Sequence, residues 1–295
     1  MDASDLKVFE AVLRLGSMNR AASELNTVQS NVTSRVRALE LELGTPLFDR
    51  HARGVSPTAA ARRLLPYALT VRRMLQDARS AVRDDGVPAG PLTIGSLETT
   101  AAMRLAPLLA DYVASYPAVD LSLRTGTTCE LVEDVLGHRV EGAFVCGPVD
   151  HPDLVGETIF QEELVALTAP HVPNLDTVIR QGNFRIVVLR ASCSYRQRLE
   201  NILARRGAVG VRILEFGTLE AVLACTGAGL GITLLPRAIV EATRRAGQVG
   251  LHTLPPEDAV VDTIFLRRRD AYVSSALSAF LSGVRPIWAS AQAAE

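Results

Sequence analysis

The sequence predicts two domains of different fold class: an all-α N-terminal domain with a short wing and a long helix, then an α/β domain. Three observations predict this division. The chain has 295 residues, more than one ordinary core holds. Apolar residues recur at helical spacing up to about residue 85, whereas strands and helices alternate after residue 91. Residues 85–91 contain two glycines and two prolines, a composition typical of a linker.

The composition is that of a globular chain, with 48% apolar and 21% charged residues. No stretch approaches the roughly 18 uncharged apolar residues of a membrane span. Two aspartates and a glutamate among the first ten residues are unlike a secretory signal, so we expect a cytoplasmic protein. In that reducing compartment the four widely spaced cysteines should be free thiols: Cys129, Cys146, Cys193 and Cys225.

The first helix is predicted from Leu6, Phe9, Val12 and Leu13, which recur at helical spacing. We expect Ser4 to cap it and Gly16 to end it. A second helix should run from Ser17 or Asn19 to Leu25, and Asn26-Thr27 should form a turn. A third should run from about Val28 to Leu43 and end at Gly44, with one apolar face made by Val28, Val32, Val36, Leu39 and Leu43.

Two short helices joined by a tight turn are typical of a helix-turn-helix, whose second helix enters the DNA major groove. Short polar groups and one arginine that can reach base edges are expected on its outward face: Gln29, Ser30, Thr33, Ser34 and Arg37. An ordinary solvated helix face is the alternative reading of this pattern.

Apolar ends flank an arginine-rich, glycine-containing tip in Thr45–Val55, and this pattern predicts a two-stranded wing. Pro57-Thr58 should then open a long helix that reaches about Asp85. Pro66 should kink this helix or mark its true start. A heptad seam favours a dimerisation helix over a helix packed only on its own domain; its members are Leu64, Ala68, Val71, Leu75, Ala78 and Val82.

The second domain is expected to contain parallel strands flanked by helices, in one large sheet or two small ones. The predicted strands are Leu92–Ser96, Val119–Thr125, Gly142–Cys146, Arg185–Leu189, Val211–Phe216, Gly231–Leu235 and Val260–Leu266. The predicted helices are Thr100–Ser115, Glu130–His138, Tyr195–Arg206, Leu219–Ala228, a helix from Arg237 and Ser274–Leu281.

Ligands of open parallel sheets bind beyond the carboxyl ends of the strands. This rule selects five loops, with candidate effector-binding residues Ser96, Glu98, Thr99, Thr100, Thr127, Thr128, Cys146, Ser192, Cys193, Ser194 and Thr218. Hydroxyls beside helix N-termini favour an anion such as a small carboxylate. Glu98 would repel one, so a ligand with an amino group is the variant reading, and Arg124 or Arg196 could balance Glu98. Alternatively, each Ser or Thr merely caps a helix.

No catalytic signature is apparent. A phosphate-binding P-loop needs a lysine after its glycines, and the sole lysine is Lys7. The sequence contains neither an HExxH nor a GxSxG motif. The five histidines are scattered along the chain. We therefore expect no enzyme, no cofactor and no metal site.

Part of the chain resembles the DNA-binding region of LysR-type transcriptional regulators. The resemblance is ungapped over roughly the first 60 residues, the length of one small domain, and rests on Phe9–Val12, Gly16–Leu25, Gln29, Val32-Thr33, Arg37–Arg50, Arg53–Val55 and Pro57-Thr58. A weaker match is Gly229–Pro236. The chain departs from the family pattern at Val28, where a capping serine is common, and at Ser34, where a basic residue is frequent.

The resemblance implies a winged helix-turn-helix domain over 1–58, a linker helix and hinge over 59–89, and an effector-binding domain over 90–295. The last would comprise two subdomains like those of periplasmic solute-binding proteins, joined by two crossing strands: subdomain I of 90–162 and 267–295, and subdomain II of 163–266. It also implies homodimers that pair into homotetramers, and double-stranded DNA carrying an interrupted palindrome as the target. In the wing, Arg53 matches the position that enters the minor groove, and Arg50 and Arg62 are candidate phosphate contacts.

The function that follows is a sequence-specific transcription regulator controlled by a small carboxylate or amino-acid-like effector bound between two subdomains. The alternative is thiol-based redox sensing through Cys193. Cys193 stands at the predicted start of a helix, where the thiol pKa falls, and near the position of the reactive cysteine in peroxide-sensing family members.

Overall fold

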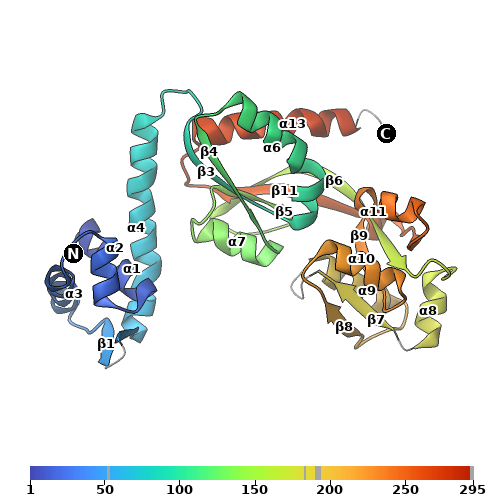
Figure 1. The fold of residues 1–295 in the computed structure, drawn as a ribbon, viewed down its shortest axis with the longest axis horizontal. Coiled ribbons are helices and arrows are strands. Elements are labelled where there is room, and N and C mark those ends of the chain that lie inside the picture. The colour runs from blue at the N-terminus through green and yellow to red at the C-terminus, as the bar shows by residue number, and fades with distance from the viewer. Residues whose placement is uncertain (52–53, 183, 190–193, 293–295) are drawn as a thin grey trace. The chain divides into compact units, whose positions relative to one another are not determined.

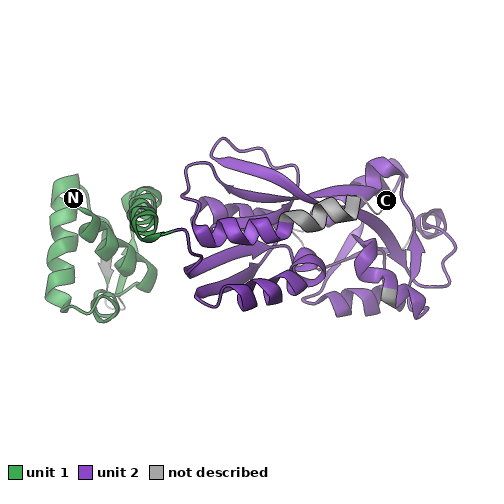
Figure 2. Cartoon of the chain, turned by 90° about the horizontal axis from the view of Figure 1, so that it is seen from above, with its two compact units in different colours: residues 1–85 green, residues 86–295 purple. Residues whose placement is uncertain are grey.

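The computed structural model describes residues 1–51, 54–182, 184–189 and 194–292. These form two compact units, residues 1–85 and residues 86–295 (Figure 2). Unit 1 contains the elements α1 (Ala3–Leu15), α2 (Met18–Glu24), α3 (Gln29–Leu43), β1 (Phe48–His51), β2 (Gly54–Pro57) and α4 (Ala59–Arg83) (Figure 1).

The helix-turn-helix of unit 1 begins and ends at local capping signals. Asp2, not Ser4, caps α1, because Asp2 has extended backbone angles and exchanges two hydrogen bonds with Asp5 in a capping box. The prediction for Ser4 was therefore wrong. Gly16 ends α1 in the left-handed conformation, as predicted, and the Ser17 side chain caps α2.

Helix α3 buries only the middle of its apolar face. Val32, Val36 and Leu39 are at most 1% exposed, whereas Val28 is 65% exposed and Leu43 38% exposed. The core of unit 1 therefore takes up the three central residues of the face predicted from the sequence. Val28 and Leu43 lie at the ends of the helix, where the core of unit 1 no longer covers them.

The wing is an antiparallel pair of strands, with Phe48 opposite Pro57, and its base belongs to the core of unit 1. The rings of Phe9 and Phe48 lie 5.6 Å apart between centroids. Gly54 has φ +132°, and a Cβ there would lie 2.5 Å from the Gly16 carbonyl oxygen. Only glycine can therefore connect the wing to the turn after α1 in this way.

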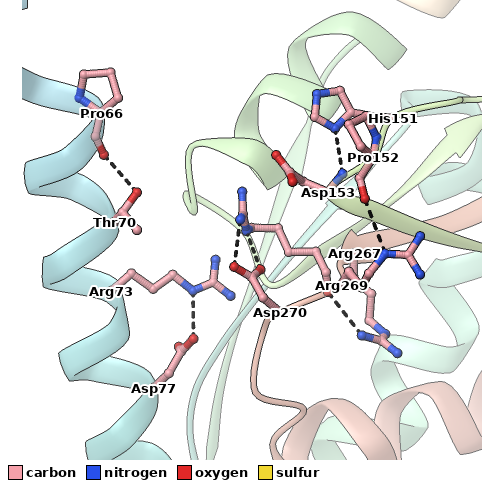
Figure 3. A network of polar contacts seen from close by, with 11 residues as sticks. Pro66, Thr70, Arg73, Asp77, His151, Pro152, Asp153, Arg267, Arg269 and Asp270 are labelled. Carbon is pink, nitrogen blue, oxygen red and sulfur yellow. Dashed lines mark hydrogen bonds and ion pairs between the residues drawn. The ribbon is translucent and has the colours of Figure 1, made fainter. Parts of the chain in front are cut away.

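Helix α4 is continuous from Ala59, with Thr58 as its N-cap, so the suggestion that Pro66 marks its true start was wrong. The Thr70 hydroxyl donates to the Pro66 carbonyl at 2.9 Å, and one turn later Arg73 Nε lies 3.0 Å from Asp77 (Figure 3). The predicted seam divides into two parts. Ala68 is buried in the core of unit 1, whereas Leu75 is 42% exposed and Val82 88% exposed.

Unit 2 contains all the remaining elements. Its strands are β3 (Gly90–Ser96), β4 (Val119–Thr125), β5 (Gly142–Cys146), β6 (Leu154–Thr168), β7 (Arg185–Val188), β8 (Arg212–Glu215), β9 (Thr233–Pro236), β10 (Gly250–His252) and β11 (Val260–Arg268). Its helices are α5 (Glu98–Thr100), the π-helical turn η1 (Ala101–Leu105), α6 (Ala106–Ser115), α7 (Thr128–Leu136), α8 (Leu175–Gln181), α9 (Ser194–Arg205), α10 (Leu219–Gly227), α11 (Arg237–Arg245), α12 (Pro256–Ala259) and α13 (Ser275–Gln292).

The strands pair in the order β10-β6-β11-β5-β3-β4, with β9 also on β6, and β7-β8 form a separate parallel pair. Strand β3 is parallel to β4 and β5, but β11 is antiparallel to β5 and β6, so the prediction of parallel sheets holds only in part. The sequence did not predict β6, α8, β10 or α12. In the middle of β6, Gln161-Glu162-Glu163 interrupts the apolar pattern by which strands are identified.

Strand β6 passes from one half of unit 2 to the other. Leu154–Glu163 pair with β11, and from Leu164 onward β6 pairs with β9 and β10. We call the half with β3, β4, β5, α6, α7 and α13 lobe I, and the half with β7, β8, β9, β10, α9, α10 and α11 lobe II (Figure 1). Thr263–Leu266 of β11, assigned to subdomain II from the sequence, pair with β5 of lobe I.

Helices cover both faces of the lobe I sheet. Phe144 of β5 packs with residues of α6 and α13, whereas its neighbours Ala143 and Val145 pack with α7 on the opposite face. The chain after β11 is tied to the loop before β6, since the Arg269 guanidinium donates to the Pro152 carbonyl at 3.3 Å (Figure 3). It also donates to the carbonyl of Leu154, the first residue of β6, at 3.1 Å. Within the described residues, no helix is both long and apolar enough to cross a membrane.

Candidate nucleic-acid interface and ligand pocket

The outward face of α3 presents the polar side chains that the sequence selected. Gln29, Ser30, Ser34 and Arg37 are exposed, and Thr33 is partly buried. The neighbouring Arg35 does not replace the basic residue that Ser34 lacks, because its guanidinium is bound to Asp5 of α1 at 2.8 Å. Arg37 is therefore the arginine of α3 that is free to reach DNA.

The start of α3 lacks a side-chain cap. Val28 occupies the N-cap position with extended backbone angles, and no side chain accepts a hydrogen bond from the first turn. The Thr27 hydroxyl accepts instead from the Asn31 side-chain amide at 2.9 Å, so Thr27 does not substitute for the missing cap. No side chain therefore occupies the N–H groups of the first turn of α3, although the Asn31 N–H donates to the Val28 carbonyl at 3.1 Å.

Glu40 fixes the wing to α3, a role that the sequence analysis missed. One oxygen of its carboxylate accepts hydrogen bonds from the backbone N–H groups of Leu47 and Phe48 at 2.8 and 3.1 Å. Of the predicted wing contacts, Arg50 lies in β1 and Arg53 lies outside the described residues. Arg62 is exposed in the first turn of α4.

A pocket lies between the two lobes of unit 2 and encloses about 680 Å³ of atom-free space, its open mouth included. The first turns of α7 and α9 face it, together with Thr233 and its neighbours at the start of β9. Its walls are largely apolar, from Leu97, Val188, Leu189, Leu199, Leu234 and Leu235. Its polar lining comes from Glu98, Thr99, Gly126, Thr127, Thr128, Cys146, Ser194, Tyr195, Arg196 and Thr233.

A hydrogen bond between Ser194 and Thr128 joins the lobes across this pocket. The Ser194 hydroxyl of α9 donates to Thr128 Oγ1 of α7 at 3.1 Å, and the same oxygen lies 3.2 Å from the Cys146 backbone N–H. Thr127 caps α7 in a capping box with Glu130. The starts of two helices, of 9 and 12 residues, therefore meet at the pocket with their positive dipole ends.

Two threonine side chains line the pocket from opposite lobes. Thr99 is 6% exposed and Thr233 3% exposed, and neither hydroxyl makes a hydrogen bond within the described residues. Neither hydroxyl oxygen is among the fully buried ones without a partner, so both can reach the pocket space and bond a ligand there. The sequence analysis missed Thr233 because it searched only the carboxyl ends of strands, and Thr233 starts β9.

Two charged residues line the pocket. Glu98 makes no ion pair within the described part of the chain, whereas Arg196 lies 3.3 Å from Glu200, one turn along α9. Arg124 does not line the pocket, because its guanidinium pairs with Asp134 at 2.5 Å. The suggestion that Arg124 balances Glu98 was therefore wrong. Within the described residues, no group of acidic, histidine or cysteine side chains could hold a metal ion.

Six of the predicted effector residues line the pocket: Glu98, Thr99, Thr127, Thr128, Cys146 and Ser194. Three others do not. Ser96 is buried and donates to the Leu97 carbonyl, Thr100 is buried outside the pocket lining, and Thr218 caps α10 by accepting from the Ala221 N–H at 3.2 Å. Ser192 and Cys193 lie outside the described residues, so the redox alternative through Cys193 stays a prediction.

Both units match family models. Residues 3–62 match the model of the bacterial regulatory helix-turn-helix protein, lysR family, and residues 85–287 match the LysR substrate binding domain. The transcriptional regulators GltR and YusT of Bacillus subtilis are each 42% identical to this chain, over 97% of its length and 96% of theirs. YofA of Bacillus velezensis is 39% identical over 97% of this chain and 99% of its own.

Solved structures agree in fold. A full-length OxyR variant from Pseudomonas aeruginosa has a TM-score of 0.70 at 18% identity, covering 97% of this chain and 94% of the other. Full-length CbnR in complex with its target DNA has a TM-score of 0.63 at 25% identity, covering 97% of this chain and 99% of the other.

Proposed function

The chain belongs to the LysR family of bacterial transcription regulators, and we propose that a small carboxylate or amino-acid-like metabolite, bound between the lobes of unit 2, controls its binding to DNA. The family models cover both the helix-turn-helix and the substrate-binding domain, so the chain is a DNA-binding regulator with an effector-binding domain. We propose no enzymatic step. Because it acts on DNA, we place it in the cytoplasm.

The pocket between the lobes carries the proposal for the effector. The positive ends of α7 and α9 meet there, and Thr99 and Thr233 offer hydroxyls that make no hydrogen bond within the described residues. Helix N-termini stabilise a carboxylate through N–H groups and dipole. The leucine and valine walls would hold an apolar body. We therefore favour a carboxylate with an aliphatic or aromatic side chain.

Glu98 decides between the two ligand classes. Its carboxylate, which makes no ion pair within the described residues, would repel a second anion but would pair with an ammonium group. An amino-acid-like effector would place its amine near Glu98 and its carboxylate near the helix starts. A simple carboxylate would bind in spite of Glu98, with Arg196 as the compensating charge.

Calorimetric titration of the full-length protein with three matched probes tests this pocket. The probes are 4-methylpentanoate, L-leucine and 3-methylbutylamine, which share an apolar body and differ in their charged groups. Binding of L-leucine alone supports the amino-acid class, and binding of both acids supports the carboxylate class. Binding of the amine alone contradicts the proposal. The proposal is also contradicted if none of the three probes binds and no member of a panel of aromatic acids binds either.

Threonine-to-valine variants locate the binding site. Thr99→Val and Thr233→Val each remove one hydroxyl that lines the pocket, and each should weaken probe binding about tenfold, the effect of one lost hydrogen bond of about 1.4 kcal/mol. Thr218→Val is the matched control, because Thr218 caps α10 away from the pocket. Equal effects of all three variants would argue against this site.

We propose that α3 reads the DNA through Gln29, Ser30, Thr33, Ser34 and Arg37, with Arg50 and Arg53 of the wing on the backbone or in the minor groove. The target would be an interrupted palindrome, and the region upstream of the chain's own gene is the first candidate. In gel-shift titrations, Arg37→Ala should weaken specific binding at least tenfold, from a loss of about 1–3 kcal/mol. Arg35→Ala is the control, since Arg35 is bound to Asp5.

We further propose that the exposed part of α4 pairs with a second copy of the chain. Tyr67, Met74, Leu75 and Val82 are 42–88% exposed along one helix, which is costly for an isolated monomer. Dimers would present two α3 helices to the two halves of a palindrome, and dimers would pair into tetramers. Sedimentation measures the oligomeric state of the unaltered chain and of a Met74→Glu variant. An oligomeric unaltered chain together with a monomeric variant would support pairing through α4.

A further inference from the structure

The crossing of β6 between the lobes carries two consecutive glutamates that bind arginines of opposite lobes. Glu162 accepts a bidentate pair from Arg104 of η1 in lobe I, with Nε–Oε1 at 2.9 Å and Nη2–Oε2 at 3.1 Å. Glu163 accepts a second pair from Arg237, the first residue of α11 in lobe II, at 2.6 and 2.7 Å. The next residue, Leu164, begins the pairing of β6 with β9.

These two pairs differ in burial. Glu162 is 7% exposed, and the Arg104 guanidinium lies over the Phe160 ring, 5.6 Å from its centroid. The Glu163 side chain is 48% exposed and that of Arg237 34%. Exposed pairs contribute little, whereas loss of one partner from a buried pair leaves an uncompensated charge. The Arg104–Glu162 pair therefore constrains the crossing, and the Arg237–Glu163 pair is a natural control.

Arg104 is connected directly to the pocket. It lies in the π-helical turn that follows Glu98 and Thr99, two pocket-lining residues, within one continuous run of helix. In this turn the Ala106 N–H donates to the Ala101 carbonyl, five residues back. Such a turn holds one residue more than an α-helical turn and is common at functional sites. A displacement of Thr99 would thus move Arg104 and, through Glu162, strand β6.

Lobe II has a corresponding connection to the other crossing strand. Arg198 lies on α9, whose first turn lines the pocket, and its guanidinium donates to the carbonyls of Glu257, Asp258 and Val260 at 3.1, 2.9 and 2.7 Å. Val260 begins β11. In each lobe, one helical segment that lines the pocket is therefore bonded to, or directly before, one of the two strands about which the lobes would turn.

We propose that Arg104 and Glu162 are positioning residues that couple the pocket to the β6 crossing and set how readily the lobes close. The inference rests on the proposed function, in that closure over the pocket is taken as the response to an effector. Ligand-driven closure of two lobes turns on a few hinge residues, and a buried bidentate pair at the crossing restricts their backbone angles.

A cross-link between the lobes measures closure without any ligand. Thr128→Cys and Ser194→Cys replace two side chains that are hydrogen-bonded at 3.1 Å across the pocket. The reference protein, which is the parent of the variants in this experiment, is the full chain that carries both changes and has its four native cysteines replaced by serine. The yield of the new disulfide at equilibrium in a glutathione redox buffer, read by mass spectrometry, reports the closed fraction. Because no effector is used, the cross-linking result stands even if the ligand titrations fail. A failed cross-linking experiment likewise leaves the result of the ligand titrations unchanged.

Glu162→Gln should lower the equilibrium constant for cross-linking about tenfold, whereas Glu163→Gln should change it less than about twofold, within the range of exposed pairs. The double variant Arg104→Met with Glu162→Met replaces the buried pair by apolar groups and should restore the melting temperature without restoring the cross-link.

Four results would overturn the proposal. The first is a Glu162→Gln variant that cross-links to the same extent as the parent. The second is a Glu163→Gln variant that loses as much cross-linking as Glu162→Gln. The third is recovery of cross-linking together with stability in the double variant, which would show a purely structural role. A parent that does not cross-link would also overturn it, because the lobes would not then meet at Thr128 and Ser194.

Discussion

Replacing Val28 by serine should stabilise unit 1, because the recognition helix α3 lacks a side-chain cap. Val28 already has the extended backbone angles of an N-cap, φ −91° and ψ 149°, so serine fits without rearrangement. Its hydroxyl would accept from the first-turn N–H groups of Ser30 or Asn31. The valine side chain is 65% exposed, so little buried apolar area is lost.

The size of the effect can be judged from known caps. A serine cap contributes about 1 kcal/mol, within a range of roughly 0.5–2 kcal/mol. For a domain of this size, that free energy raises the melting temperature by roughly 4–8 °C. Thermal unfolding of the full chain followed by circular dichroism, at one protein concentration, measures the change in the unit 1 transition.

Val28→Ala separates the cap from the loss of the valine side chain, because alanine cannot accept a hydrogen bond. The serine variant should melt above both the alanine variant and the parent. Equal melting temperatures for serine and alanine would contradict this explanation, since the first turn of α3 would then gain nothing from an acceptor at this position.

Three further predictions concern the wing, its turn and the second unit. Arg53→Ala should weaken operator binding and reduce the slope of log affinity against log salt by about 1 in gel-shift titrations; an unchanged slope would remove Arg53 from the interface. Gly54→Ala should cost roughly 1–3 kcal/mol in urea unfolding, because its Cβ would lie 2.5 Å from the Gly16 carbonyl oxygen at φ +132°; parental stability would contradict this. Burial lowers the pKa of His252, which bonds Thr168 at 2.8 Å. The unfolded chain then binds the proton first as pH falls through about 6.5, so unit 2 should lose stability on acidification and His252→Gln should flatten this slope; an unaltered slope in the variant would count against it.

Local chemistry explains what was predictable in unit 1. Gly16, Ser17 and Thr58 act on their own neighbours in sequence, so the helix boundaries that they set could be read from the residues alone. Ser4 failed as a cap because the helix already begins at Ala3, where the Asp2 carboxylate accepts from the Asp5 N–H, so Ser4 lies inside the first turn. The sequence offered both residues as possible caps, and the backbone conformation of the folded chain decides between them.

The candidate site was predictable only in part. The rule for parallel sheets selected Thr99, Thr127 and Thr128, because each follows a strand that could be recognised by its apolar run. The rule did not select Thr233 and Tyr195, since they reach the pocket from the start of β9 and from the first turn of α9, not from a loop after a strand. Their places depend on how lobe II folds back on lobe I.

The residues alone were enough to predict the fold class of each unit, the polar outer face of α3 and the helix starts that favour an anion, because these properties depend on residues within one or two turns of each other. The folded chain was needed to show that Arg35 is bound to Asp5 and that the seam of α4 is half buried. It was also needed to show that Glu162 and Glu163 diverge to opposite lobes. These contacts join residues up to 74 positions apart, and which partner a charged or apolar side chain meets depends on the path of the chain between them.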